Sequence, residues 1–229
     1  MYCSLTLVKY PKFAGIGGFL SMAIFRLPLY FKSAISFWKL MGCGKNGTFD
    51  KVPDWRQWAV LTCSATVDGT SLPPFCNSWF RLWGCEISTI LLQPIEGHGL
   101  WDAKQPFGKL AKSTEYEGPI CVLTRATIRL SQLSAFWQNV APVAQTMTAA
   151  PGFLGSVGIG EVPWIKQATF SIWQSKAGMK QFAYQRKEHA TVVQKTRKEK
   201  WYSEEMFVRF IPLAATGYFH KILQFDEKL

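Results

Sequence analysis

The order of predicted strands and helices over residues 120–213 constrains the fold more than any other feature of the chain. In sequence order the pattern indicates a strand at 120–128, a helix at 131–147 with Ser131 as N-cap, strands at 153–160 and 167–173, helices at 175–185 and 188–199, and a strand at 206–213. The strands are predicted from runs of β-branched and aromatic residues, and the helices from apolar side chains spaced three and four apart. This β-α-β-β-α-β order is that of the ferredoxin-like unit.

The first half of the chain shows a weaker version of the same order. Its predicted elements are a strand at 2–9, a helix at 19–40 that stops at Gly42 and Gly44, a strand at 57–65, a helix at 72–83 and a strand at 86–95. A polar, turn-rich stretch at 102–118 joins the two halves, which we delimit as residues 1–112 and 113–229. Two such units can pack sheet against sheet, so the expected fold is α+β, a pseudo-dimer of the dimeric α+β barrel type within one chain.

The composition excludes a disordered chain. Of the 229 residues, 48% are hydrophobic and only 18% are charged, and a chain of this length can bury a large core. Aromatic residues make up 15% of the chain. Rings in such numbers must line either a core or an apolar cavity.

The net charge of +11 suits nucleic acid, an anionic membrane surface or an acidic partner protein. The densest basic run extends from Arg186 to Lys200, but Glu188 and Glu199 interrupt it at helical spacing. Such a pattern is typical of a solvated helix face. These interleaved acids, and the lack of a strand motif that combines basic and aromatic residues, argue against nucleic acid as a partner.

The cysteines and the apolar segment at 13–25 bear on the compartment. The six cysteines form no CxxC pair, so we expect reduced, mostly buried thiols rather than a zinc site.

Segment 13–25 is apolar and follows Lys9 and Lys12, as the apolar core of a signal peptide follows basic residues. However, no cleavage site follows promptly, and the segment is too short to span a bilayer. We expect a cytoplasmic protein in which this segment is a docked helix or, alternatively, an amphipathic helix resting on a membrane.

Without a phosphate loop, a Ser-His-Asp arrangement or a dinucleotide fingerprint, the histidines are the residues to weigh. His98 lies between glycines and His220 lies near the C-terminus, so both are expected to be peripheral. His189 shares a helical stripe with Met179 and Phe182 and is therefore expected to face the sheet. There are two interpretations of its imidazole. It lies in the core and hydrogen-bonds to a backbone carbonyl, or it binds a haem iron in a dry pocket.

Basic residues acquire a second role if the chain binds haem. Arg125 and Arg129 stand four apart in VLTRATIR and are expected to share one face of a strand. Arg186 lies close to His189 on the predicted helix. Each of the three is a candidate partner for a haem propionate, with ordinary surface charge as the alternative.

Six segments together resemble the spheroidene monooxygenase family over nearly the whole chain. They are FWKLMGCG at 37–44, GHGLWDAKQPF at 97–107, VLTRATIR at 122–129, GIGEVPWIKQATFSIW at 158–173, EHATVV at 188–193 and KWYSEEMFVRFIPL at 200–213. The GIGEVP…FSIW segment followed by the helix that carries His189 is the most specific part. Segments 66–85 and 108–118 match the family poorly.

The resemblance implies a haem-containing oxygenase that takes electrons from reduced ferredoxin and oxygenates an apolar, carotenoid-like substrate at an allylic carbon. It also implies the dimeric α+β barrel architecture, with haem b as cofactor and His189 as the axial ligand of its iron. The candidate pocket-wall residues, for each of which a place in the core is the alternative, are Phe170, Trp173, Met179, Phe182 and Trp201.

Other classes of function stay open at this point. The same barrel suits a haem-dependent dehydratase, lyase or peroxidase, and a non-enzymatic haem-binding protein is a further alternative. The helix expected within 13–41 carries Arg26, Lys32 and Lys39 among aromatic residues. It is therefore a candidate for peripheral membrane contact.

Overall fold

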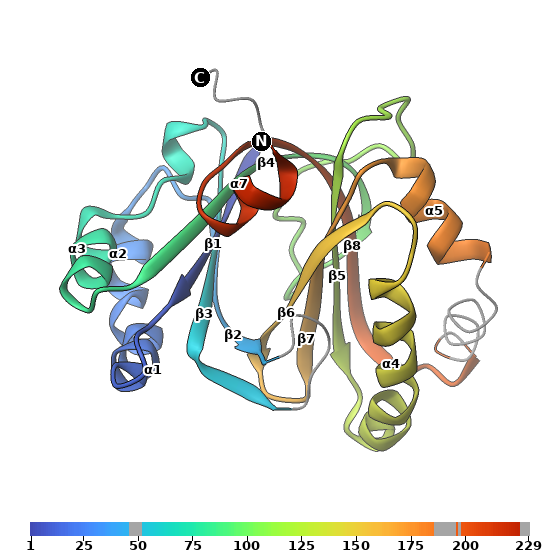
Figure 1. Cartoon of the computed structure of the whole chain (residues 1–229), viewed down its shortest axis with the longest axis horizontal. Helices are drawn as coiled ribbons and strands as arrows, with labels where there is room; N and C mark the ends of the chain where they lie inside the picture. The colour runs from blue at the N-terminus through green and yellow to red at the C-terminus, as the bar shows by residue number, and fades with distance from the viewer. Residues whose placement is uncertain (46–51, 186–195, 197, 225–229) are drawn as a thin grey trace.

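In the part of the chain that the structure describes, eight strands form one antiparallel sheet that closes into a barrel (Figure 1). The structure is a computed structural model and describes residues 1–45, 52–185, 196 and 198–224. The strands are β1 (Tyr2–Lys9), β2 (Phe37–Gly44), β3 (Pro53–Ser64), β4 (Glu86–Gly99), β5 (Ile120–Ile128), β6 (Phe153–Val162), β7 (Lys166–Trp173) and β8 (Tyr202–Ala215). Their order around the barrel is β1-β3-β2-β6-β7-β5-β8-β4.

Each half of the chain contributes one ferredoxin-like sheet to the barrel. β1 to β4 lie within residues 1–112 and follow the order β4-β1-β3-β2, and β5 to β8 lie within residues 113–229 and follow the order β8-β5-β7-β6. The two sheets join at two seams, where β4 pairs with β8 and β2 pairs with β6. The predicted α+β pseudo-dimer of the barrel type is confirmed.

The helix predicted over 19–40 is wrong in its second part. The structure has two short helices, α1 (Gly15–Ile24) and α2 (Arg26–Phe31), and then strand β2. β2 pairs with β3, so Gly42 and Gly44 lie in a strand rather than at a helix end. Only Lys32, Ser33 and Ser36 interrupt the apolar residues at this boundary, and a short apolar run has no period that separates helix from strand.

Helices cover the outer surface of the barrel on two sides (Figure 1). α1, α2 and α3 (Pro74–Leu82) lie against the first half, and α4 (Leu133–Thr148) and α5 (Lys176–Gln185) lie against the second. None of the helices among the described residues is both long and apolar enough to cross a membrane.

The helices predicted at 131–147 and 175–185 agree with α4 and α5 except at the start of α4. α4 begins at Leu133, with Gln132 at its N-cap and no capping side chain, so the cap expected at Ser131 is wrong. A short 3₁₀ turn at Leu130–Gln132 takes up that position instead. The helix expected at 188–199 lies largely outside the described residues.

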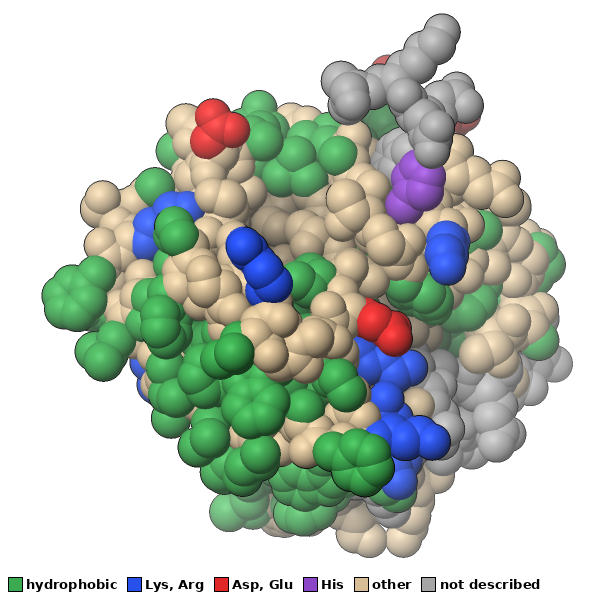
Figure 2. All heavy atoms as spheres, turned by 60° about the vertical axis from the view of Figure 1, so that its left-hand side comes forward, with side chains coloured by type: hydrophobic (Ala, Val, Ile, Leu, Met, Phe, Trp, Pro, Cys, Tyr) green, Lys and Arg blue, Asp and Glu red, His purple; other side chains and the backbone are tan. Residues whose placement is uncertain are grey.

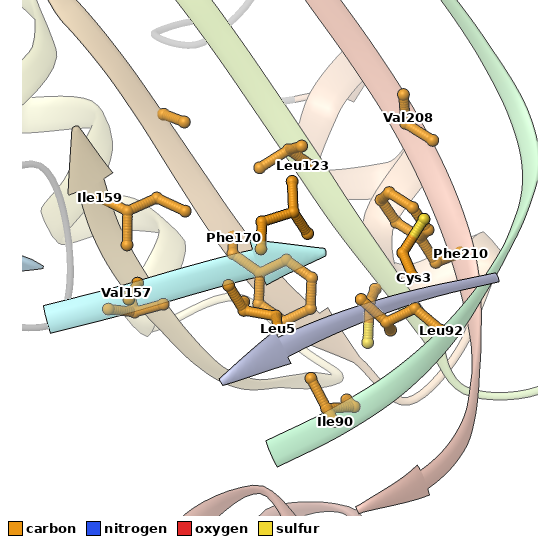
Figure 3. Packing of buried hydrophobic residues seen from close by; sticks show 14 of the residues in the cluster. Cys3, Leu5, Ile90, Leu92, Leu123, Val157, Ile159, Phe170, Val208 and Phe210 are labelled. Carbon is orange, nitrogen blue, oxygen red and sulfur yellow. The ribbon is translucent and has the colours of Figure 1, made fainter. Parts of the chain in front are cut away.

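Apolar side chains fill the inside of the barrel (Figure 3). Residues such as Leu5, Leu123 and Val208 point inward from their strands and pack together, as the two-residue period of a strand requires. The short helix α7 (Tyr218–Leu223), which the sequence did not lead us to expect, covers one end of the barrel. There the ring of Phe219 lies 6.1 Å from that of Phe170, centroid to centroid.

All six cysteines are free thiols, and five of them are buried, as predicted. Cys3 and Cys63 face each other across β1 and β3 with their sulfur atoms 3.2 Å apart. Burial raises the pKa of Cys76 to about 12. These thiols therefore serve as core residues.

Candidate functional site

The predicted pocket-wall residues fall on two sides of the second-half sheet. Along β7, Phe170 points into the barrel, whereas Trp173 points outward to the helices. Trp173, Met179 and Phe182, which we call the α5 cluster, pack together outside the barrel, with the rings of Trp173 and Phe182 5.4 Å apart. Trp201 belongs to a separate outer group, the Trp201 cluster, made of Ile128, Phe136, Trp137 and Trp201.

Small side chains occupy the outer face of the sheet between these two clusters. Across the strands, Ser156 pairs with Ser171, and Thr169 is paired with Gly158 on one side and Thr124 on the other. These five residues, the small-residue strip, alternate along their strands with the residues that fill the barrel. Thr124 is exposed although β5 is a central strand of the sheet. Thr124 is therefore an exposed point in the middle of this face.

The hydroxyl of Thr169 is a second unusual feature of the strip. Thr169 is buried, and its Oγ1 atom has no hydrogen-bond partner among the described residues. A buried polar atom without a partner calls for an explanation, such as a missing ligand. Small side chains make up the strip, and aromatic clusters bound it at both ends. Small and aromatic side chains of this kind are chemically compatible with a flat, largely apolar cofactor such as haem.

Two of the predicted cofactor residues cannot be compared with this geometry. Arg186 and His189 lie outside the described residues, in the connection that runs from α5 to Trp201. The strip, which the sequence analysis did not identify, has one sequence signal: Thr169 and Ser171 alternate with apolar residues in QATFSIW.

Arg125 and Arg129 do not share a face, so that expectation is wrong. Arg125 points inward and is buried, whereas Arg129 lies just beyond the end of β5 and is exposed. The register of β5 against β8 shifts between Thr127 and Ile128, which breaks the alternation on which the expectation was based. The Arg129 backbone N–H donates to the Trp201 carbonyl at 2.8 Å, so Arg129 borders the Trp201 cluster.

Arg125 belongs to a network of charges that closes the barrel at the end opposite α7. This barrel-mouth network contains three cations and three carboxylates, Lys39, Arg125, Lys166, Asp102, Glu161 and Glu204. They come from β2, β5, β6, β7, β8 and the loop after β4. Since both halves of the chain contribute, the network ties the two sheets together.

Trp101 lies at the centre of the barrel-mouth network and is fully buried. Its indole N–H donates to Glu161 Oε1 at 2.7 Å. The ring centroid lies 5.7 Å from Lys39 Nζ and 5.6 Å from Arg125 Cζ, within the range of cation–π attraction. Trp101 thus joins the apolar core of the barrel to its charged end.

The backbone after Trp101 adopts a rare conformation that Glu204 holds in place. Asp102 and Ala103 both have positive φ, at 50° and 60°. Their N–H groups donate to the two carboxylate oxygens of Glu204, at 2.9 Å and 2.7 Å. Left-handed backbone is costly for residues other than glycine, so this carboxylate stabilises a strained turn.

Two carboxylates of the network, Asp102 and Glu204, have lowered pKa values. Burial raises the pKa of Asp102, but hydrogen bonds and charge from Lys166 and Lys39 outweigh that effect and lower it to about 2. For Glu204, burial is again outweighed, here by the N–H groups of Ala103 and Asp102 and by Arg125, so its pKa is lowered. The network is therefore a balanced structural cluster at neutral pH.

A second buried group of charges lies outside the barrel, on β4 and β8. Glu96 is buried, and it accepts hydrogen bonds from Lys176, from Arg209 at 2.5 Å, and from the backbone N–H and hydroxyl of Thr114, both at 2.7 Å. Glu96 thereby joins β4, β8, the start of α5 and the loop before β5. Burial alone would raise its pKa, but these donors lower it to about 2.

Glu96 is expected to make stability depend on pH in acid. Its pKa in the folded chain, about 2, lies below the ordinary value of 4.5, so the ionised form stabilises the fold. This contribution is complete above about pH 5 and disappears as the pH falls towards 2. In urea unfolding, the stability difference between the parent chain and Glu96→Gln should shrink by roughly 3 kcal/mol over that range. Glu86→Gln, an exposed change on the same strand, should show no such trend, and a constant difference for Glu96→Gln would contradict the assignment.

Of the other two histidines, His220 is peripheral, as predicted, whereas His98 lies in β4 rather than in a loop and pairs with Phe207, the cross-strand neighbour of Thr124. His98 is exposed at the end of β4, with its ring stacked on Phe207 at 5.7 Å, and His220 is half-buried in α7. The described residues contain no group of three or more His, Cys, Asp or Glu side chains that could hold a metal ion. A hollow of about 350 Å³ lies at the start of α4, bounded by Leu133, Trp137 and Trp164 among others, beside the Trp201 cluster.

Three bacterial proteins named spheroidene monooxygenase are similar in sequence to this chain. The chain is 32% identical to the protein of Rhodobacter capsulatus, over 93% of this chain and 91% of that protein. It is 31% identical to the protein of Rubrivivax gelatinosus, over 79% and 70%. Against the protein of Cereibacter sphaeroides the identity is 29%, over 84% of this chain and 60% of that longer protein. No family model matches the chain.

Solved structures of aldoxime dehydratases have a similar fold. One in complex with butyraldoxime gives a TM-score of 0.59 at 8% identity, with 93% of this chain and 79% of that chain covered. Another gives 0.58 at 8% identity, with 92% and 80% covered. At this identity the likeness concerns the architecture alone.

Proposed function

The chain belongs to the spheroidene monooxygenase family, and we propose that it is a haem-dependent enzyme that oxygenates an apolar, carotenoid-like substrate at an allylic carbon. The family membership supports the assignment of the chain to the monooxygenases. In this proposal O₂ is the oxidant and reduced ferredoxin supplies the electrons. The cofactor is haem b, held on the outer face of the second-half sheet.

The small-residue strip is the observation that supports this location. It combines small side chains with an exposed threonine, Thr124, and with a buried hydroxyl on Thr169 that has no hydrogen-bond partner among the described residues. The α5 cluster and the Trp201 cluster bound the strip with aromatic side chains. Phe170 faces the other side of the sheet and therefore takes no part in the proposal.

The residues have distinct roles in this proposal. His189 is the axial ligand and presents a neutral imidazole nitrogen. Trp173, Met179, Phe182 and Trp201 exclude water and hold the apolar faces of cofactor and substrate. When bound, haem supplies the activation of O₂ and the uptake of electrons.

Two arginines are proposed to pair with the propionates. Arg129 is exposed beside the Trp201 cluster, and Arg186 precedes His189 in sequence. A guanidinium group binds a carboxylate through paired hydrogen bonds. Arg125 is engaged with carboxylates inside the barrel and is therefore assigned a structural role.

An imidazole ligand bears on the substrate class. A neutral histidine donates less electron density to iron than the thiolate of cytochromes P450 does. The C–H bond attacked is therefore expected to be a weak one, and an allylic carbon of a polyene meets that condition. A saturated hydrocarbon should be a poor substrate.

An absorption spectrum after haem supplementation tests the cofactor assignment. The parent chain should show a Soret band that saturates at about one haem per chain, and His189→Ala should lose or shift it because the axial nitrogen is gone. His220→Ala is the matched control, since His220 lies in α7 at one end of the barrel, and it should keep the parent spectrum. A parent chain that stays colourless at stoichiometric haem would refute the assignment.

Isotope labelling then separates the oxygenase from the rival reactions. With spheroidene, reduced ferredoxin and ¹⁸O₂, the product should carry label, and omission of the reductant should abolish turnover. A dehydratase or lyase would work without net oxidation, and a peroxidase would accept peroxide without O₂. A haem-loaded chain that converts nothing would favour a non-enzymatic haem-binding protein.

A further inference from the structure

Helix α1 turns its small residues inward and its bulky apolar residues outward. Gly17, Gly18 and Ser21 are buried. A side chain at Gly18 would meet the indole of Trp58 at 2.0 Å, so α1 packs closely against the barrel only through small residues. Its outward face carries Ile16 and Phe19, both exposed. This arrangement is the reverse of an ordinary amphipathic helix on a soluble domain.

The exposed apolar surface continues from α1 into α2. Six side chains make up what we call the α1–α2 face: Phe13, Ile16, Phe19, Leu27, Tyr30 and Phe31. Phe13 is 98% exposed and Phe31 is 75% exposed. Single exposed apolar residues need no explanation, but a contiguous group of this kind marks an interaction site.

The segment that forms this face carries only positive charges. Residues 1–49 contain Lys9, Lys12, Arg26, Lys32, Lys39 and Lys45 and no aspartate or glutamate. Lys12 and Arg26 are exposed beside the apolar residues. Figure 2 shows this side of the molecule, where hydrophobic side chains spread over a broad area with Lys and Arg side chains beside them.

We propose that the α1–α2 face docks on an anionic lipid bilayer. Aromatic side chains with neighbouring lysine and arginine match the boundary between acyl chains and negatively charged headgroups. A second copy of the chain fits less well, because a two-fold dimer would bring two cationic faces together. α1 and α2 would lie in the plane of the membrane surface, with the barrel above them.

This surface is separate from the proposed cofactor site. α1 and α2 cover the first half of the barrel, whereas the small-residue strip lies on the outer face of the second half (Figure 1). The proposal therefore does not depend on the proposed function. The protein without cofactor or substrate is sufficient to test it.

Vesicle flotation tests the docking surface directly. The purified chain should float with vesicles of three parts phosphatidylcholine to one part phosphatidylglycerol, and less with phosphatidylcholine alone or at high salt. Phe13→Gln with Phe31→Gln should weaken binding at least tenfold, because two inserted rings are lost. Leu130→Gln with Val162→Gln, exposed apolar positions on the second half, should bind as the parent chain does.

A pair of charge variants tests the electrostatic part. Lys12→Gln with Arg26→Gln should weaken binding to the anionic vesicles by about fivefold per cation. Lys109→Gln with Lys112→Gln, which removes two exposed cations elsewhere, should have little effect. All variants change exposed residues, so their unfolding curves should match that of the parent chain.

Three results would overturn the proposal. The first is a parent chain that does not float with anionic vesicles. The second is an equal loss of binding in the Leu130/Val162 control and in the Phe13/Phe31 variant. The third is a parent chain that is dimeric in light scattering and becomes monomeric in the Phe13/Phe31 variant without any change in flotation, which would assign the face to a second copy.

Discussion

The Arg125→Ala variant is expected to lose about 3–5 kcal/mol of unfolding free energy, the usual cost of breaking a buried ion pair from one side. The Arg125 side chain is 1% exposed and pairs with Glu204, with Asp102 at 3.4 Å and with Glu161 at 3.7 Å. Its removal leaves three carboxylates facing two lysines inside the barrel mouth. It also deprives Glu204 of the partner that helps it to hold the left-handed turn at Asp102 and Ala103.

Arg129→Ala is the matched control for this prediction. Arg129 is an arginine just beyond the same strand, but it is exposed, so its loss should change stability by no more than about 0.5 kcal/mol. Urea unfolding followed by tryptophan fluorescence measures both variants. Equal stabilities of the two variants would show that Arg125 is not part of the closure of the barrel. If Arg125→Ala lost haem binding but kept the stability of the parent chain, Arg125 would instead be assigned to cofactor binding.

Trp101→Ala is expected to cost about 3–5 kcal/mol, as truncations of large buried aromatic residues do. The indole fills the end of the barrel between Phe37 and Phe107, with ring centroids 5.6 Å and 6.5 Å away. Its truncation leaves a cavity and also removes the hydrogen bond to Glu161. The cavity and the lost hydrogen bond therefore both lower the free energy of unfolding.

Trp55→Ala controls for the loss of an indole as such. Trp55 lies on β3 and is 59% exposed, so little apolar contact is lost and stability should change by less than about 1 kcal/mol. The two variants are compared by denaturant unfolding at pH 7. If Trp101→Ala were as stable as Trp55→Ala, the barrel mouth would have to collapse around the missing ring, contrary to the role given to Trp101.

The sequence predicted the second half of the fold better than the first for a physical reason. β5, β6 and β7 are bounded by turns and helices with clear polar positions, so their limits are visible in the pattern. In the first half, α1, α2 and β2 follow one another through a nearly continuous apolar stretch. The outward-facing apolar residues of α1, including Phe19, removed the polar stripe that usually marks a surface helix.

The candidate site was only partly accessible from sequence. The sequence analysis named Phe170 and Trp173 together as pocket-wall candidates, whereas the structure places them on opposite faces of β7. The small-residue strip could not be identified from one strand alone. It is formed by Thr169, Thr124 and their neighbours on adjoining strands, and only the pairing register of the sheet brings these residues together. The barrel-mouth network was missed because its six charges lie far apart in the chain and come together only when the sheet closes.

The two seams of the barrel have a consequence for synthesis of the chain on the ribosome. The first half emerges with β2 and β4 as its outer strands, and their partners β6 and β8 follow much later in the sequence. Until then both edges present unpaired backbone groups, which invite pairing with other chains. A first half that folds before β6 and β8 emerge therefore exposes two open sheet edges, which only the completed chain closes.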